Sequence, residues 1–393
     1  AIEKLLKQNT QQAFQNGERQ KLGNVLLTGA TGFLGIHILK EFLENEEGMI
    51  YCFMRSGKLS SLEKRLKSML VYYFENSYDD LFGIRIFPVE GDITRADDFK
   101  LLENLPIDTV INCAANVKHF AHSEEIERIN VGGVQNAIDF CKAKACQLIQ
   151  ISTASVAGFS IDGNPAEDIQ MDETMLYFGQ NLDNKYIGSK FHAERLVLQE
   201  ILNGLKAKIM RVGNLMARNR DGEFQINFHT NGFINRLRAY QAIGKISYSI
   251  LGASTEFAPI DSTAQAVLKL ACAPKECCVF HPYNNHSIFI GDVIEVMKEK
   301  GMTIEAVEEC EFEKHLSMAM RDKSKAEALA GLIAYLNMGR GKRVFPLATS
   351  NDYTMQILYR YGFKWPLTTD EYLDKFISLL TGLGFFMEDT TNV

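Results

Sequence analysis

The chain has 393 residues and a formal net charge of -7, with 46% hydrophobic and 23% charged residues. This composition is typical of soluble domains, so it excludes a disordered chain and a fibrous repeat. The acidic balance excludes the general basic surface of a nucleic-acid-binding protein, although it allows a local basic pocket for one phosphorylated ligand. At this length we expect two structural units, because single domains usually span about 100–200 residues.

The first 17 residues are polar and contain no apolar signal core, and no apolar run has the length of a membrane-spanning helix. The eight cysteines lie in apolar stretches without zinc spacing, so we expect buried thiols and no metal site. For the adjacent Cys277 and Cys278, one inward and one outward strand residue is favoured over a strained disulfide. We therefore predict a cytoplasmic protein that binds neither membrane nor nucleic acid. Because residue 1 is alanine, the chain is compatible with a piece cut from a longer polypeptide.

Strand and helix patterns alternate through the first two thirds of the chain, as in a parallel sheet with crossover helices. Short apolar runs predict six strands, at residues 24–28, 49–55, 84–89, 109–113, 147–152 and 208–212. Apolar residues at helical spacing predict helices between them, at residues 34–43, 62–74, 126–142 and 186–202. We therefore expect an α/β fold with a doubly wound parallel Rossmann sheet and right-handed crossovers.

The pattern changes after residue 211. A segment rich in Asn, Gly and Arg is followed by amphipathic helices predicted at residues 262–272, 291–300 and 370–380. We expect a leader at 1–20, a Rossmann domain at 21–255 to which 256–283 return, and a smaller, mostly helical substrate subdomain at 284–393. That subdomain is expected to cover the carboxyl ends of the strands, where ligands bind in such sheets.

The first predicted strand is followed by a glycine-rich segment that opens a helix, Gly29-Ala30-Thr31-Gly32-Phe33-Leu34-Gly35. The spacing is G-x-x-G-x-x-G, and in this context it indicates a pyrophosphate site. Gly29 permits a tight turn, Gly32 lets the backbone approach phosphate, and Gly35 lets the helix pack on the sheet. The helix N-terminus adds free N–H groups and the positive end of its dipole. Every residue of the segment except Ala30 is therefore a candidate cofactor contact.

The end of the second predicted strand decides the cofactor, because a carboxylate there binds the ribose hydroxyl of NAD. Arg55 occupies this position, and residues 56–58, which include Lys58, follow it. A cationic group at this place suits the 2'-phosphate of NADPH. Arg65, in the next predicted helix, is either the second side of a phosphate clamp or a solvated helix charge. NADPH is the expected cofactor.

Further cofactor contacts are expected where the third and fourth predicted strands end. Asp92 and Ile93 should lie beside the adenine, and Ala114, Ala115 and Asn116 should lie close to the adenosine ribose. These expectations depend on the strand order of a doubly wound sheet.

Tyr186 and Lys190 are four residues apart on a predicted helix, so both side chains lie on one face. This is the only Tyr-x-x-x-Lys match in the chain, and it follows a strand that ends in the hydroxyl cluster 152–155. We predict Tyr186 as the proton donor, with Lys190 lowering the pKa of the phenol and holding the nicotinamide ribose. Thr153 is expected to stabilise the oxygen that becomes anionic as hydride arrives. The alternative is a core tyrosine and a surface lysine.

These motifs together resemble the extended short-chain dehydrogenase/reductase family over most of the chain, through residues 29–35, 112–115, 152–155, Tyr186 with Lys190, 211–214 and 257–261. Within that family the chain is most similar to the terminal thioester reductase domains of nonribosomal peptide synthetases. Carboxylic acid reductases and fatty acyl reductases share the glycine-rich opening, so the tail 351–380 with its Tyr-Gly-Phe-Lys-Trp-Pro segment carries most of the finer assignment. The resemblance also implies that Gly213 and Asn214 contact the cofactor.

The resemblance implies that NADPH reduces an acyl or peptidyl thioester held on the phosphopantetheine arm of a carrier protein in the same parent polypeptide. A tetrahedral oxyanion held by Thr153 and Tyr186 would then collapse to an aldehyde, which some relatives reduce again to an alcohol. The basic segment 117–120 departs from the family pattern. Lys118 or His119 either contacts substrate or carrier, or has a structural task in its loop.

Two other functions remain open. A nucleotide-sugar epimerase or dehydratase uses the same sheet and Tyr/Lys pair, but such enzymes commonly favour NAD and have an acidic residue where this chain has Arg55. Comparing the binding constants of NADPH and NADH separates this function from a reductase. A non-catalytic NADPH sensor is the second alternative, and it would bind NADPH tightly without oxidising it with any thioester or aldehyde.

Overall fold

The computed structural model describes residues 1–12, 19–57, 60–116, 123–160, 169–337 and 346–386. The chain forms two compact units: unit 1 comprises Ala1–Leu215, Ile260–Tyr283 and Val344–Lys364, and unit 2 comprises Met216–Pro259, Asn284–Arg343 and Trp365–Val393. These boundaries differ from the expected ones, because 216–259 belong to unit 2 and 344–364 return to unit 1. In that returning segment β15 (Ala348–Thr349) pairs with β6 (Gln170–Met171), a long-range pairing that local periodicity does not encode.

In the described part of the chain, unit 1 contains a seven-stranded sheet of order β12-β7-β5-β4-β1-β2-β3, with every neighbouring pair parallel. The strands are β1 (Val25–Thr28), β2 (Ile50–Met54), β3 (Ile86–Glu90), β4 (Thr109–Asn112), β5 (Gln147–Thr153), β7 (Ala207–Val212) and β12 (Val279–Phe280). The doubly wound Rossmann sheet is therefore confirmed. Strand β12 was not expected, because two residues are too short for a periodic signal. The strand order reverses between β1 and β4, which is where such sheets bind ligands.

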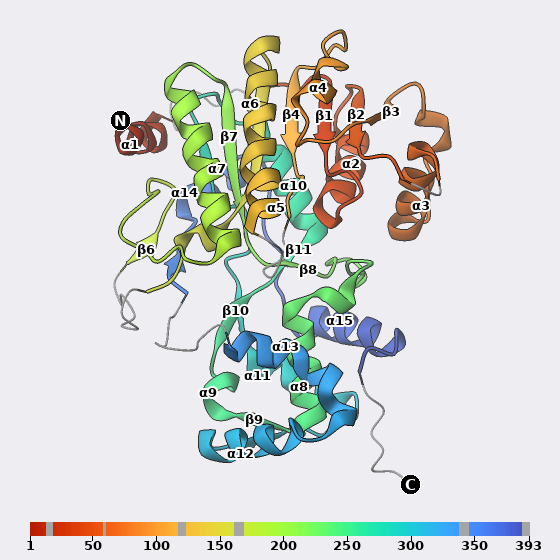
Figure 1. Ribbon diagram of the computed structural model, residues 1–393, viewed down its shortest axis with the longest axis vertical. Coiled ribbons are helices and arrows are strands. Elements are labelled where there is room, and N and C mark those ends of the chain that lie inside the picture. Colours follow the sequence, from red (N-terminus) through yellow and green to blue (C-terminus); the bar gives the residue numbers. More distant parts are fainter. Residues whose placement is uncertain (13–18, 58–59, 117–122, 161–168, 338–345, 387–393) are drawn as a thin grey trace. The chain divides into compact units, whose positions relative to one another are not determined.

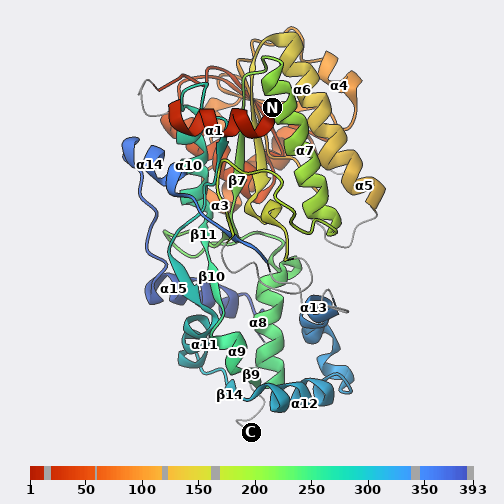
Figure 2. The ribbon, with the colours of Figure 1, turned by 90° about the vertical axis from the view of Figure 1, so that its left-hand side faces the viewer.

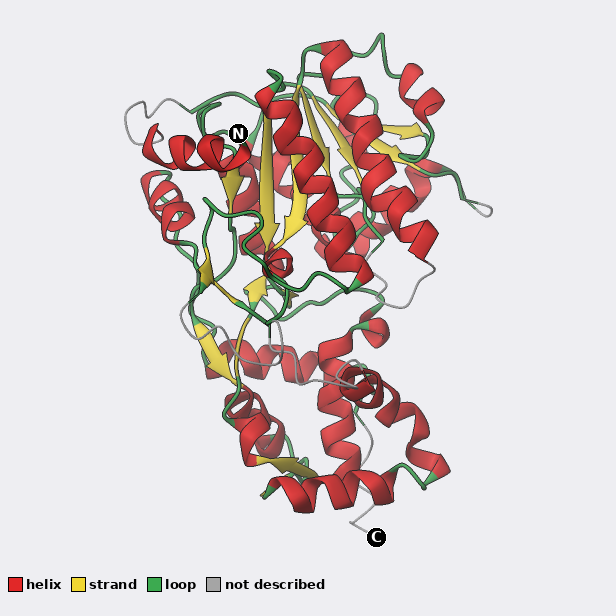
Figure 3. Cartoon of the chain, turned by 60° about the vertical axis from the view of Figure 1, so that its left-hand side comes forward, coloured by secondary structure: helices red, strands yellow, loops and turns green. Residues whose placement is uncertain are grey.

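Helices cover both faces of this sheet (Figures 1 and 3). The helices are α1 (Ile2–Gln12), α2 (Phe33–Asn45), α3 (Leu62–Phe74), α4 (Ala96–Lys100), α5 (Ser123–Glu127), α6 (Gly133–Lys144), α7 (Lys185–Leu202), α10 (Ile260–Ala271) and α14 (Asp352–Arg360). On one face α2 packs against α10, and on the other α6 packs against α7. Strands β1 and β2 are buried at every position, as expected for a parallel sheet covered on both sides.

Two local features of unit 1 differ from the sequence pattern. The first residues, expected as a leader, form α1, and its Leu6 is buried in the same hydrophobic core as residues of α7. The helix expected at 126–142 is divided by one π-helical turn, Arg128–Gly132, between α5 and α6. A search for 3.6-residue periodicity assumes one uninterrupted helix, so it did not predict this turn.

Unit 2 is mostly helical (Figure 2). Its helices are α8 (Gly232–Ile243), α9 (Tyr248–Leu251), α11 (Ile290–Glu299), α12 (Glu309–Ala319), α13 (Ala326–Asn337) and α15 (Asp370–Gly382). Short strands form two pairs, β10 (Ser254–Glu256) with β13 (Ser287–Phe289) and β14 (Glu305–Val307) with β9 (Lys245–Ser247). Strands β8 (Leu215–Met216) and β11 (Ala258–Pro259) lie where the chain passes between the units. The core of unit 2 includes edge-to-face contacts of Phe376 with Phe224 and Phe257.

Among the residues described above, no helix combines the length and the apolar character needed to cross a membrane. All eight cysteines are free thiols. Cys277 and Cys278 directly precede β12 rather than lying in a strand as expected, and both are buried.

Candidate functional site

A cleft of about 580 Å³ lies at the carboxyl ends of β1, β2, β3 and β4. The expected site residues that line it are Gly29, Thr31, Gly32, Arg55, Arg65, Asp92, Ile93, Ala114 and Ala115. The strands that carry them are neighbours in the sheet, so the loops that follow meet at the point where the strand order reverses. The sequence therefore identified the wall of one continuous cleft.

The loop between β1 and α2 depends on two glycines. Gly29 has a φ of +70°, and a Cβ there would lie 2.9 Å from the backbone N of Ala114. A Cβ on Gly35 would lie 2.1 Å from the carbonyl oxygen of Gly29. The close neighbour of Gly35 is thus the loop itself, not the sheet as expected. Gly32 is the N-cap of α2 and its N–H donates to the Gly29 carbonyl at 2.9 Å, so the helix N-terminus carries no side chain that would block an anion.

Two arginines lie together at the end of β2. The Arg65 Nη2 donates to the Arg55 carbonyl oxygen at 2.8 Å, which holds the Arg65 guanidinium beside the cleft wall rather than in open solvent. Burial alone would raise the pKa of Asp92, but hydrogen bonds from Thr94 and the charge of Arg55 outweigh burial and lower it. The Asp92 carboxylate is therefore ionised on the cleft wall, close to the Arg55 charge.

The three catalytic candidates gather at the carboxyl end of β5. Tyr186 lies in the first turn of α7, which begins after the N-cap Asn184, whose Oδ1 accepts a hydrogen bond from the Ile187 N–H at 3.1 Å. The Tyr186 hydroxyl is hydrogen-bonded to the Thr153 hydroxyl, and the Lys190 Nζ donates to the carbonyl of Ile151 at 3.1 Å. The Thr153 Oγ1 also accepts a hydrogen bond from the backbone N–H of Ser155 at 3.1 Å, so its own proton is available for donation.

Burial moves the pKa values of the tyrosine and the lysine in opposite directions. It raises the pKa of Tyr186 to about 12, and the hydrogen bond from Thr153 only partly opposes this. It lowers the pKa of Lys190 to about 8, against the opposing influence of Cys113 and Glu194. The expected lowering of the Tyr186 pKa by Lys190 is not what the structure shows, because desolvation of the phenolate dominates and the opposing influence comes from Thr153. At neutral pH the phenol is protonated and the amine is mostly charged.

Cys113 and Asn130 lie near the catalytic candidates. Cys113 lines the cleft and also lies within electrostatic reach of Lys190. Asn130, in the π-helical turn, accepts a hydrogen bond from the Asn116 N–H at 2.8 Å and donates to the Ser189 hydroxyl at 3.0 Å. Sequence reasoning missed Asn130, although a buried amide inside an apolar helix pattern was a usable signal.

Other expected residues lie elsewhere. Within the part of the chain that the structure describes, Gly213 and Asn214 follow β7 and are not among the residues that line the cleft. Phe33, Leu34 and Gly35 belong to the first turn of α2, behind the loop that forms the cleft wall. Lys58, Lys118 and His119 lie outside the described residues.

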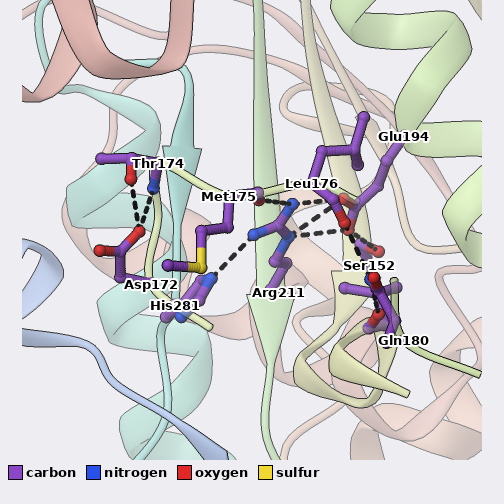
Figure 4. A network of polar contacts seen from close by, with 10 residues as sticks. Ser152, Asp172, Thr174, Met175, Leu176, Gln180, Glu194, Arg211 and His281 are labelled. Carbon is purple, nitrogen blue, oxygen red and sulfur yellow. Dashed lines mark hydrogen bonds and ion pairs between the residues drawn. The ribbon is translucent and has the colours of Figure 1, made fainter. Parts of the chain in front are cut away.

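Glu194 of α7 and Arg211 of β7 form a fully buried ion pair (Figure 4). The Arg211 Nη2 contacts the Glu194 Oε2 at 2.8 Å, and its Nε lies 3.1 Å from Oε1 and 3.0 Å from Oε2. Both side chains are 0% exposed. The Ser152 hydroxyl donates to the Glu194 Oε1 at 2.5 Å, and the Arg211 Nη2 also donates to the carbonyl of Met175 at 3.0 Å. The pair therefore joins α7 to β5 and β7.

His281 extends this network from the segment after β12. Its Nε2 lies 3.0 Å from the Arg211 Nη1, and its Nδ1 lies 2.7 Å from the carbonyl of Ser350. A guanidinium only donates hydrogen bonds, so Nε2 accepts and the ring is neutral with its proton on Nδ1. Burial, reinforced by the Arg211 charge, holds the pKa of His281 well below its usual range. The sequence signal for this network was an arginine inside the apolar strand 208–212.

The sequence pattern of the family described as "Male sterility protein" matches residues 27–267. A solved thiolation-reductase di-domain from an archaeal non-ribosomal peptide synthetase is 41% identical, with a TM-score of 0.89 over 98% of this chain and 81% of that chain. The reductase domain of the aureusimine biosynthetic cluster is 25% identical, with a TM-score of 0.82 over 98% of this chain and 97% of that chain. A linear gramicidin synthase of Brevibacillus parabrevis is 23% identical over 94% of this chain. The chain spans only 7% of the length of that synthase.

Substitution of Gly35 by alanine tests the glycine-rich loop. We expect Gly35→Ala to lower the free energy of unfolding by about 1–3 kcal/mol, because its Cβ must displace the Gly29 carbonyl. The affinity for NADPH should fall about tenfold or more, because that carbonyl belongs to the cleft wall. Thermal unfolding and fluorescence titration measure both. Gly132→Ala is the matched control, since nothing lies within 4 Å of a Cβ there. Unchanged NADPH affinity in Gly35→Ala would contradict this account of the loop.

The neutral state of His281 predicts a pH dependence of stability. Above the usual histidine pKa of about 6.5 both the folded and the unfolded states are neutral at this residue, so it contributes no pH dependence. Below it the unfolded state takes up a proton that the folded state refuses, so stability is lost as the pH falls, by up to about 1.4 kcal/mol per pH unit. Chemical denaturation between pH 7 and pH 5 measures the slope. We expect a shallower slope for His281→Gln, whereas exposed His192→Gln should retain the original one; equal slopes would refute the assignment.

Proposed function

The chain belongs to the family described as male sterility protein, within the extended short-chain dehydrogenases/reductases, and we propose that it is an NADPH-dependent reductase releasing a carrier-bound thioester as an aldehyde. The observation that carries the proposal is the meeting of Thr153, Tyr186 and Lys190 at the end of β5, next to the cleft. These groups provide a hydrogen-bond donor, a proton donor and a positive charge at one place. This combination suits the reduction of a carbonyl.

The residues of the cleft fit a dinucleotide phosphate. The cleft wall at Gly29 and Gly32 and the uncapped N-terminus of α2 suit the pyrophosphate. Arg55 and Arg65, adjacent at the end of β2, would hold the 2'-phosphate that distinguishes NADPH from NADH. When bound, NADPH supplies a hydride for the carbonyl carbon of the substrate.

Thr153 and Tyr186 act on the oxygen of the thioester carbonyl. Two hydroxyl groups that are hydrogen-bonded to each other can both donate to one oxygen that arrives between them. As negative charge develops there, the two donors stabilise the oxyanion. Because the pKa of Tyr186 is raised to about 12, its phenol retains the proton until that oxygen becomes basic enough to take it.

Lys190 acts on the phenol and on the cofactor ribose. Its ammonium stabilises the phenolate that remains after Tyr186 gives up its proton. One donor of the ammonium is used by the carbonyl of Ile151, and the other two remain for the nicotinamide ribose hydroxyls. Through these bonds Lys190 orients the cofactor as well as stabilising charge.

Product release completes the proton balance. The Tyr186 phenolate takes back the proton of the hemithioacetal hydroxyl as the carbon–sulfur bond breaks. The departing thiolate is protonated by solvent, so thioester, NADPH and one proton give aldehyde, thiol and NADP⁺. A second round with another NADPH would give the alcohol, and product analysis distinguishes the two outcomes.

A carrier protein with a phosphopantetheine arm is the proposed partner, within the same parent polypeptide. The proposal is supported by the di-domain relative, in which thiolation and reductase domains are joined, and by the gramicidin synthase that contains a matching segment. The direct test mixes the protein with NADPH and a panel of acyl thioesters, on pantetheine and on carrier proteins, while absorbance loss and aldehyde formation are followed.

Removal of the phenol hydroxyl tests the proton donor. We expect Tyr186→Phe to lower kcat by about 10²–10⁴-fold, the usual contribution of a positioned acid. The Kd for NADPH should stay nearly unchanged, because Lys190 and the cleft wall remain. Stopped-flow turnover with an acyl pantetheine and titration of NADPH fluorescence measure the two quantities. Wild-type turnover by this variant would refute the acid role of Tyr186.

Removal of the basic end of β2 tests the cofactor choice. Arg55→Ala should raise the Kd for NADPH by about 10–100-fold, since a charge-assisted hydrogen bond is lost, and should leave the Kd for NADH unchanged. The double variant with Arg65→Ala should lose the remaining preference for NADPH. Arg95→Ala, an exposed arginine paired with Asp98, is the control. Equal losses for both cofactors in Arg55→Ala would argue against a 2'-phosphate site.

A further inference from the structure

The Glu194–Arg211 ion pair lies close in sequence to the candidate catalytic residues. Glu194 lies one helical turn beyond Lys190 on α7, and Ser152, which donates to its carboxylate, directly precedes Thr153 on β5. The Glu194 carboxylate is thus bonded to the strand that carries one catalytic group and belongs to the helix that carries the other two (Figure 4). Any shift of α7 along β5 would break these bonds.

The groups that face Lys190 come from three elements. The Cys113 thiol follows β4, the Ile151 carbonyl belongs to β5, and Glu194 is on α7. Burial raises the pKa of both the Cys113 thiol and the Tyr186 phenol to about 12, so both groups are neutral at pH 7. Among these facing groups, Glu194 is the anion that favours the charged amine. Arg211 approaches the carboxylate from β7, the strand on the far side of β5 from β4.

We propose that Glu194 is a positioning residue for the reaction: fixed by Arg211 and Ser152, its carboxylate holds Tyr186 and Lys190 in register with Thr153 and keeps the Lys190 amine charged. The inference rests on the proposed function, because it assigns a task in that reaction. The inference distinguishes the contribution of the ion pair to folding from its contribution to the site. The pair is not required for folding if apolar side chains of similar volume replace both partners together, as is often found for buried pairs. It is required for the geometry and charge of the site.

The test uses the double variant Glu194→Leu with Arg211→Met, which removes both charges and leaves neither stranded. We expect it to fold, to bind NADPH with unchanged Kd and to show a kcat about tenfold lower than wild type. The alkaline limb of the kcat profile, which the Lys190 pKa of about 8 places near pH 8 in wild type, should move to lower pH, since the facing anion is gone. A folded double variant with wild-type kcat and pH profile would overturn the proposal.

Glu200→Gln is the matched control, because Glu200 is a carboxylate on the same helix that pairs with Lys142 at 2.6 Å on the surface. It should leave kcat and the pH profile unchanged, and an equal shift in this control would show a general charge effect and overturn the specific role. Glu194→Asp retains the charge with a shorter reach. We expect it to restore the alkaline limb toward pH 8 while kcat stays reduced.

Ser152→Ala keeps the proposal testable if the charge variants do not fold. It removes the hydrogen bond to the Glu194 Oε1 and leaves every charge in place. We expect kcat to fall about threefold or more at unchanged Kd for NADPH and an unchanged alkaline limb, because register is loosened while the anion remains. Wild-type kcat in this variant would overturn the positioning role.

One measurement separates this inference from the proposed function. In protein labelled with ¹³C at lysine Cε, the NMR signal of Lys190, identified by its absence in Lys190→Gln, reports the charge of the amine without turnover. The double variant should shift its midpoint to lower pH, even if no thioester in the panel is reduced. Failure of every thioester with such a shift would refute only the proposed function. If the enzyme reduces a thioester but the Lys190 midpoint does not move in the double variant, the inference is refuted and the proposed function is not.

Discussion

The buried pair of Glu194 and Arg211 is the interaction that joins the elements at the end of unit 1 where the candidate catalytic residues lie. Removing one partner of such a pair typically costs about 3–5 kcal/mol, because an uncompensated charge remains in the interior. That is a large share of the roughly 5–15 kcal/mol by which domains are stable. The pair joins one helix to two strands, and through His281 it reaches the carbonyl of Ser350 in the returning tail segment. The tail is thereby part of the framework behind the site.

The cleft depends on a different constraint, which is steric. The chain turns sharply after β1 with a left-handed residue, Gly29, and α2 begins so close to that turn that Gly35 cannot carry a Cβ. The result is a wall made of backbone at the place where the strand order reverses. Arg55 and Arg65 lie at one end of this wall. The hydroxyl groups of Thr153 and Tyr186 lie with Lys190 at the end of β5. Cys113 connects the two regions.

Local patterns predicted the sheet and much of the cleft, because each depended on features that a sequence displays. Apolar runs indicated β1 to β5 and β7, and the glycine spacing together with Arg55 indicated the cleft wall. The features that the sequence did not predict depend on contacts between residues distant in sequence. Strand β12 has two residues, and the return of 344–364 to unit 1 depends on the pairing of β15 with β6. No period in the sequence encodes either of these features.

The polar network was harder to predict for a physical reason. Whether a charged residue in an apolar strand is stable depends on a partner that only the fold brings near it. Arg211 was visible as an unusual residue in a buried strand, but its partners, Glu194 and His281, are 17 positions before it and 70 positions after it. The roles of Ser152 and Asn130 follow in the same way from neighbours that the sequence does not place.

Burial also makes the proposed site suited to reduction. One physical cause, the exclusion of water, raises the pKa of Tyr186 to about 12 and lowers the pKa of Lys190 to about 8. A phenol tuned downward would serve as a base and favour oxidation of an alcohol, whereas a phenol kept protonated is ready to donate to an oxygen that gains charge. The same burial disfavours the charged form of the Lys190 amine. The Glu194 carboxylate, one helical turn after Lys190, opposes this effect and favours the charged amine. Helix α7 therefore carries the proposed acid Tyr186, the Lys190 amine and the anion that favours the charge of that amine.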